Sequence, residues 1–243
     1  MGEHGKYGPL VKNALIAGLC ALADPAEACR LALVLAIDVS SSVDASEDQL
    51  QRAGLAAALI APDVQAAFFA SPDPVALFIF EWSGRYNQNE ILPWTMIKSR
   101  EDLLNAADTV LDSKRNHDDF PTAMGYALGH AAIQLQQMPH CLFHTIDVAG
   151  DGINNEGFGP KAAYRAFPFD DVTVNGLLIQ SNGNIGTPDP LMFYRNQVIR
   201  GPGAFIEIAN DFDDYENAMR RKLIREVTPQ VIGGTFQYMD QPG

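Results

Sequence analysis

The chain has 243 residues, of which 47% are apolar and 19% charged, a composition that allows a substantial buried core. Its formal net charge of −13 at pH 7 argues against a nucleic-acid partner, because binding to phosphates requires a basic surface. Beyond the N-terminal region, no segment is long and apolar enough for a membrane span. We therefore expect a globular protein that neither binds nucleic acid nor crosses a membrane.

A signal peptide is predicted at residues 1–28. Lys6 and Lys12 precede an apolar stretch at residues 14–23, and residues 26–28 (AEA) have the small-residue pattern of a cleavage site. The alternative is a short buried helix. Cleavage would make Cys29 the first residue, which raises the question of a lipid anchor, although the preceding residues fit a lipobox poorly. The expected location is the periplasm or the medium.

The rest of the chain alternates strand-like apolar runs with amphipathic segments, which is typical of a doubly wound α/β fold. We expect a mostly parallel sheet of about six strands, covered by helices on both faces, in one domain at residues 29–227, followed by a loose tail at 228–243. In chain order, the predicted elements are a strand at 31–38, a helix at 46–60, strands at 75–80 and 89–97, helices at 100–111 and 122–137, a strand at 141–148, a helix at 160–166, strands at 172–179 and 203–208, and a helix at 211–227.

Two local signals refine these elements. Ser46 and Gln49 fit a capping box at the start of the first helix, and Pro62 is expected to end that helix. The strand at 89–97 is assigned to an edge of the sheet, because Pro93 cannot donate a ladder hydrogen bond. We expect one edge strand to be antiparallel.

Polar residues follow two of the predicted strands and precede one helix. Asp38, Ser40 and Ser42 come directly after the first strand, Thr122 stands at a helix start, and Asp151 follows the strand at 141–148. Ligands of open parallel sheets bind at the carboxyl ends of the strands. In an extended loop, alternate residues project to the same side. Hydroxyl and carboxylate oxygens suit Mg²⁺, Mn²⁺ or Ca²⁺, so the sequence predicts a divalent-cation site.

Two other interpretations of these residues stay open. A turn between a strand and a helix often carries Asp and Ser merely as helix caps. Asp147 competes with Asp151 for the role of second carboxylate, but it lies inside a predicted strand, whereas the following loop frees Asp151. We therefore expect Asp151 to face the cation.

The pattern Asp-x-Ser-x-Ser, with a later Thr and a later Asp, resembles the metal-ion-dependent adhesion site of von Willebrand factor A domains. The chain is similar, more specifically, to an uncharacterised family of secreted bacterial A-type domains. The segments that carry this similarity span most of residues 31–226, and they are LALVLAIDVSSSVD, PTAMGYALGHA, DVAGDGINNEG, VTVNGLLI and RNQVIRGPGAFIEIANDFDDYENAMRRKL.

The resemblance implies a function and a role for each site residue. Ser40, Ser42 and Thr122 would contact the metal directly or nearly so, and Asp38 and Asp151 would often act through water. It further implies an exported protein-binding module, in which a bound cation, Mg²⁺ by preference, coordinates an Asp or Glu carboxylate of a protein partner.

The sheet order of the resembled family also implies a disulfide. In that order the first strand lies beside the strand that leads to Asp151. Cys29 is nine residues before Asp38, and Cys141 is ten residues before Asp151, so both cysteines fall at the opposite end of neighbouring strands. Neighbouring strands are close enough for a disulfide, and we predict Cys29–Cys141. Two buried free thiols are the alternative.

Two alternatives to a protein-binding module are considered. A metal-dependent phosphohydrolase also begins its chemistry with an Asp after a first strand, but it needs a second carboxylate two residues later, where this chain has Ser40. A metal-free structural or assembly domain would keep the fold without the ligand. No G-x-S-x-G motif is present, so serine hydrolysis is disfavoured, and we expect a protein that is not an enzyme.

Overall fold

The computed structural model describes residues 1–2, 28–180 and 189–229. The predicted signal peptide, apart from its ends, and the predicted tail beyond residue 229 lie outside the described residues. The strands are β1 (Cys29–Asp38), β2 (Val75–Ser83), β3 (Asn87–Ile97), β4 (Cys141–Gly150), β5 (Val172–Ile179) and β6 (Ile206–Ala209). The helices are α1 (Ala45–Ile60), α2 (Pro62–Phe68), α3 (Arg100–Asp112), α4 (Met124–Leu135), α5 (Pro160–Ala166), α6 (Pro190–Phe193), a π-helical turn η1 (Tyr194–Val198) and α7 (Tyr215–Val227).

The strands form one sheet in the order β3-β2-β1-β4-β5-β6. Only β3 runs antiparallel to its neighbour, and it lies at the edge, so the predicted fold class and the position of the Pro93 strand are confirmed. Every residue of β1 and β2 is buried. These strands are continuous apolar runs because both of their faces are covered, as in parallel sheets generally.

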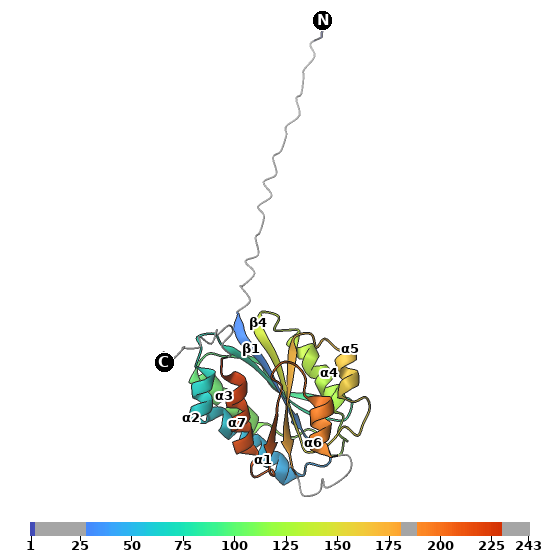
Figure 1. The fold of residues 1–243 in the computed structure, drawn as a ribbon. Coiled ribbons are helices and arrows are strands. Elements are labelled where there is room, and N and C mark those ends of the chain that lie inside the picture. Colours follow the sequence, from blue (N-terminus) through green and yellow to red (C-terminus); the bar gives the residue numbers. More distant parts are fainter. Residues whose placement is uncertain (3–27, 181–188, 230–243) are drawn as a thin grey trace, which may run out of the picture.

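Helices cover both faces of the sheet. Figure 1 shows α1, α2, α3 and α7 on one side and α4, α5 and α6 on the other. Side chains of β1 alternate between the two cores: Leu33 and Leu35 pack on the first side, and Val34 and Ala36 on the second. None of the helices in the described ranges is long and apolar enough to cross a membrane.

A disulfide joins the first residues of β1 and β4. Cys29 and Cys141 are register partners with their Cα atoms 4.4 Å apart, and the predicted disulfide is confirmed. The bond closes a loop with a sequence separation of 112 residues. In the chain-entropy model, a loop of that length stabilises the fold by about 4–5 kcal/mol.

The start of α1 differs from the prediction. Asp44, not Ser46, caps the helix: its side chain accepts hydrogen bonds from the backbone at Ser46 and Glu47, and Glu47 completes the capping box in place of Gln49. The helix does end at Ile60, but Pro62 begins α2 because proline fits the first turn of a helix, where its missing N–H leaves no hydrogen bond unmade.

Other elements also differ from the sequence prediction, several of them by a few residues at one end. The helix expected from Thr122 begins at Met124, because the backbone at Thr122 is bound by a neighbouring loop. Strand β6 begins at Ile206 rather than Gly203, since Gly201 and Gly203 both have positive φ and form a turn. The segment α6–η1 was not predicted at all. It is short, and its single turns have too few residues for a helical period to appear.

Candidate metal centre

The five residues predicted to bind a cation lie together at the carboxyl ends of β1 and β4. The Ser40 and Ser42 Oγ atoms are 3.2 Å apart, and Thr122 Oγ1 donates a hydrogen bond to Ser40 Oγ at 3.1 Å. Ser42 Oγ donates to Asp151 Oδ1 at 2.8 Å. Asp38 joins this chain because its Oδ1 accepts from the backbone N–H of Ser40 at 2.8 Å. Three stretches that are far apart in the sequence therefore supply one connected set of hard oxygen atoms.

Most of the centre is buried, and one residue opens it to solvent. Asp38 and Ser40 have 0% exposure, Asp151 has 2% and Thr122 has 4%. Ser42 is exposed, as is its neighbour Ser41. A ligand from solution would therefore approach the centre from the side of Ser42.

The electrostatics of the centre favour a cation. Burial raises the pKa of Asp38 to about 8, the charge of Asp151 adds to the increase, and the hydrogen bond from Ser40 opposes it. Asp38 Oδ2 is buried and has no hydrogen-bond partner among the described residues. Burying a carboxylate oxygen without a partner is unfavourable. A bound cation would remove this cost, so the residues present fit a hard divalent ion.

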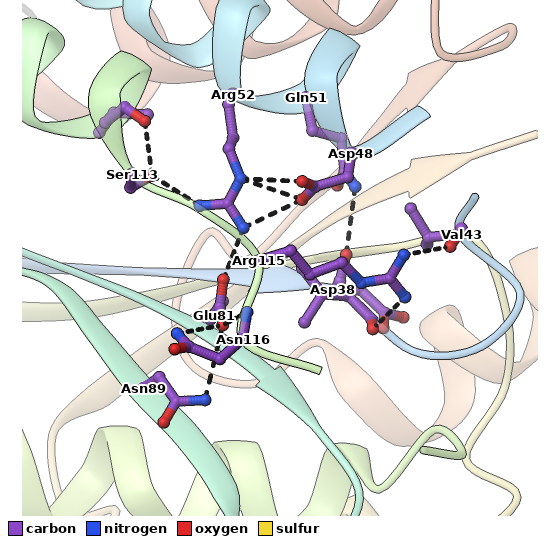
Figure 2. A network of polar contacts seen from close by, with 12 residues as sticks. Asp38, Val43, Asp48, Gln51, Arg52, Glu81, Asn89, Ser113, Arg115 and Asn116 are labelled. Carbon is purple, nitrogen blue, oxygen red and sulfur yellow. Dashed lines mark hydrogen bonds and ion pairs between the residues drawn. The ribbon is translucent and has the colours of Figure 1, made fainter. Parts of the chain in front are cut away.

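The loop that follows β1 is held by residues from other elements. Arg115, which follows α3, donates hydrogen bonds to the carbonyl oxygens of Ser40 at 2.9 Å and Val43 at 2.8 Å. Gln51 of α1 donates to the carbonyl oxygen of Asp38 at 3.1 Å. Figure 2 shows Gln51 of α1 and Arg115 both reaching this loop. Sequence reasoning missed Arg115, since no local motif surrounds it.

The loop after β4 holds Thr122 in place. The Asn155 side chain accepts from the backbone N–H of Thr122 at 2.8 Å, and the Asn154 side chain accepts from that of Gly125 at 3.1 Å. A side chain at Gly125 could not be accommodated, because its Cβ would lie 2.0 Å from the carbonyl oxygen of Phe158. The start of α4 is therefore fitted to the loop that carries Asp151.

The rival carboxylate, Asp147, lies elsewhere. Its side chain is buried in β4 and pairs with Lys222 of α7 at 3.0 Å. Lys222 also pairs with Glu226 at 2.6 Å. Asp147 is thus part of a structural ion-pair cluster between the sheet and α7, and the hydroxyl cluster contacts Asp151 instead.

Several known proteins are similar to this chain. The model of the family described as "Protein of unknown function (DUF1194)" matches residues 28–231. No curated protein matches. Among solved structures, proximal thread matrix protein 1 from the mussel byssus has a TM-score of 0.59 and 16% identity, covering 82% of this chain and 48% of that chain. Another structure of that mussel protein is described as having a zinc-occupied MIDAS motif, the abbreviation for metal-ion-dependent adhesion site.

Two bacterial structures are also similar. A von Willebrand factor type A protein from Catenulispora acidiphila has a TM-score of 0.57 and 15% identity, covering 82% of this chain and 43% of that one. The pilus adhesin SpaC from Lactobacillus rhamnosus GG has a TM-score of 0.60 and 13% identity, with coverages of 82% and 31%. The described chain spans less than half of each of these proteins. Because the family model covers most of its length, the chain belongs to the DUF1194 family, and its fold is that of a von Willebrand factor A domain.

Proposed function

We propose that this protein is a cation-dependent protein-binding module of the adhesion type, in which a bound Mg²⁺ coordinates a carboxylate from a partner protein. One observation carries the proposal: three hydroxyls and two carboxylates from separate loops meet where Asp38 Oδ2 is buried without a hydrogen-bond partner among the described residues. Mn²⁺ and Ca²⁺ accept the same oxygen donors.

In this proposal, Ser40, Ser42 and Thr122 hold the cation, and Asp38 and Asp151 balance its charge. The hydroxyl ligands are neutral, so they leave cation charge available to an external acidic group. Ser42 is exposed, and this gives a partner's Asp or Glu side chain a route to the ion. The cation supplies a positive charge and an exchangeable coordination position.

The proposed location is the periplasm or the medium. The disulfide between Cys29 and Cys141 suits an oxidising compartment. Residues 1–28 supply the predicted signal peptide. A pilus adhesin and a byssus matrix protein are among the proteins of similar fold, which agrees with a role outside the cytoplasm.

The hydrogen bonds of the centre favour binding over catalysis. Ser40 and Ser42 are bonded to each other, to Thr122 and to Asp151 rather than to a histidine. His130 and His144 bond to Gln134 and to a backbone carbonyl, respectively, away from the centre. A nucleophilic serine is commonly activated by a hydrogen-bonded histidine, and the described contacts of Ser40 and Ser42 include none.

Loss of two hydroxyls tests the site. Mg²⁺ and Mn²⁺ are titrated into the purified chain by calorimetry, and the rise in Tm is recorded with each ion. We expect the Ser40→Ala/Ser42→Ala double variant to lose the response, because both substitutions remove metal-facing oxygens. Ser41→Ala is the matched control, since Ser41 is exposed and its backbone N–H bonds to the Phe120 carbonyl. A double variant with the full wild-type response would contradict the assignment.

A second measurement tests the partner carboxylate. The chain is loaded with Mn²⁺, and water-proton relaxation is followed while an Asp-containing peptide or its Asn counterpart is added. We expect the Asp peptide to reduce the relaxation enhancement, because its carboxylate displaces a metal-bound water, and the Asn peptide to have a much smaller effect. Equal effects of the two peptides would refute carboxylate recognition.

A further inference from the structure

A tyrosine from a distant part of the chain reaches the inner side of the candidate metal centre. Tyr194 begins the π-helical turn η1, and its side chain is fully buried. Its hydroxyl oxygen lies 3.0 Å from the position that a Cβ on Gly150 would take, and Asp38 Oδ2 lies 2.8 Å from the same position. The two oxygen atoms therefore both lie within 3.0 Å of one point beside the last residue of β4.

Neither of these two oxygen atoms is satisfied. Tyr194 Oη and Asp38 Oδ2 are both buried, and neither has a hydrogen-bond partner among the described residues. Buried polar atoms nearly always have a partner, so each exception calls for an explanation. A phenol O–H is a donor and a carboxylate oxygen is an acceptor, so each group supplies what the other lacks.

The surrounding backbone leaves room for this arrangement. A Cβ on Gly176 of β5 would lie 2.6 Å from the Tyr194 ring, and a Cβ on Gly150 would obstruct the hydroxyl. The turn that carries the tyrosine is also fixed: Ile199 N–H donates to the Tyr194 carbonyl at 3.1 Å, and the Tyr164 hydroxyl donates to the Val198 carbonyl. π-helical turns are rare and frequently occur at functional sites.

The phenol stays protonated in this environment. Burial raises the pKa of Tyr194 well above its usual value, and the negative charges of Asp38 and Asp151 raise it further. The hydroxyl is therefore available as a hydrogen-bond donor to a carboxylate.

We propose that Tyr194 is a positioning residue of the metal centre: its hydroxyl donates to one bridging water, which donates to Asp38 Oδ2, and this fixes the carboxylate for cation binding. The inference rests on the proposed function. Groups that hydrogen-bond to metal-facing carboxylates orient them, and their loss typically weakens metal affinity about 10- to 100-fold. The residue acts through Asp38.

The test compares two tyrosines that share one property. The hydroxyl of Tyr215 on α7 is also fully buried without a described partner, but the charged groups that act on it are Asp147 and Arg52. Mg²⁺ and Mn²⁺ affinities and the Tm of the metal-free protein are measured for Tyr194→Phe and Tyr215→Phe. We expect Tyr194→Phe to bind the ions about 10- to 100-fold more weakly without a lower metal-free Tm. Tyr215→Phe should keep the wild-type affinity.

A second pair of variants tests the same geometry without touching the tyrosine. Gly150→Ala places a methyl group 2.8 Å from Asp38 Oδ2 and 3.0 Å from the Tyr194 hydroxyl, whereas Gly152→Ala adds a methyl group where nothing lies within 4 Å. We expect only Gly150→Ala to weaken cation binding.

The possible outcomes separate the two proposals. Wild-type affinity in Tyr194→Phe, or equal affinities in the two alanine variants, would overturn the role of Tyr194 and leave the metal centre standing. A lower metal-free Tm with unchanged affinity would show that the tyrosine is only structural. A wild-type chain that binds neither ion would overturn the proposed function itself.

Discussion

Two buried carboxylates on neighbouring strands have opposite surroundings. Glu81 of β2 and Asp38 of β1 are close to each other in the register of the two strands, and both have 0% exposure. Glu81 pairs with Arg52 at 2.5 Å and accepts from Asn116 at 2.8 and 2.9 Å. Asp38 has one oxygen bonded to the Ser40 backbone and one without a described partner. Figure 2 shows both groups within the same view.

The comparison contrasts carboxylates that have a cationic side chain as partner with one that has an oxygen atom without a described partner. Arg52 and Asn116 hydrogen-bond Glu81 within the protein, and Lys222 forms an ion pair with Asp147 at 3.0 Å. Arg115 lies close to Asp38, yet its hydrogen bonds go to backbone carbonyls. Burial alone therefore does not distinguish these carboxylates, whereas the presence of a cationic side chain that pairs with the carboxylate does.

The largest loss of stability is expected from removing the arginine that pairs with Glu81. Arg52→Met leaves Glu81 and Asp48 buried without their arginine, and breaking a buried ion pair in this way costs about 3–5 kcal/mol. Urea unfolding in EDTA measures this loss. A loss below about 1 kcal/mol would show that Asn116 alone compensates Glu81, and the contrast with Asp38 would weaken.

A substitution at Asp38 is expected to leave the metal-free stability unchanged or to increase it. Asp38→Asn replaces a buried carboxyl group that folding forces to take up a proton near neutral pH, while the amide oxygen still accepts from Ser40. The metal-free variant should unfold at the same or a higher urea concentration than wild type, and Mg²⁺ should no longer raise its Tm. A metal-free variant that is clearly less stable than wild type would place Asp38 in the same structural class as Glu81.

The pH dependence of metal-free stability tests the same difference. The pKa of Asp38 is about 8 in the folded chain and about 3.9 in an unfolded one. Between these values the folded state retains a proton that the unfolded state has lost. Stability should therefore fall as pH rises from about 4 to about 8, by up to about 1.4 kcal/mol per pH unit from this group. Asp38→Asn should reduce that slope in urea titrations, and an unchanged slope would contradict the assignment.

The smallest effect is expected where both charges are solvated. Arg220 of α7 and Asp63 of α2 form an ion pair at 2.7 Å, but both side chains are more than 40% exposed. Water screens such pairs, so we expect Arg220→Ala to leave the Tm almost unchanged. A large loss here would mean that the contact between α2 and α7 depends on charge as well as on its apolar side chains.

Much of the fold could be predicted from the sequence because its signals are local. Strand β5 (Val172–Ile179) and helix α5 (Pro160–Ala166) have the predicted bounds, and the central strands are continuous apolar runs. The proximity of Asp38 and Asp151 could also be predicted from the parallel sheet, because the carboxyl ends of parallel strands share one edge of the sheet.

The remaining parts of the site could not be predicted, because they depend on contacts between distant residues. Glu81, Arg115 and Tyr194 lie in segments without a recognisable motif. Their roles depend on contacts with residues that are distant in the sequence. The capping error at α1 has a local cause: Asp44 and Ser46 are both good caps, and the sequence did not show which one precedes the first helical turn.

The crosslink at the far end of β1 and β4 has a consequence for the cation face. These strands carry Asp38 and lead to Asp151, and at about 3.3 Å per residue the sulfur atoms lie about 30 Å from the carboxylates. Sliding one strand past the other by a single residue would turn its side chains to the opposite face. Covalent attachment of Cys29 to Cys141 forbids that slippage. The disulfide at one end of the two strands thus preserves the alignment of Asp38 and Asp151 at the other end.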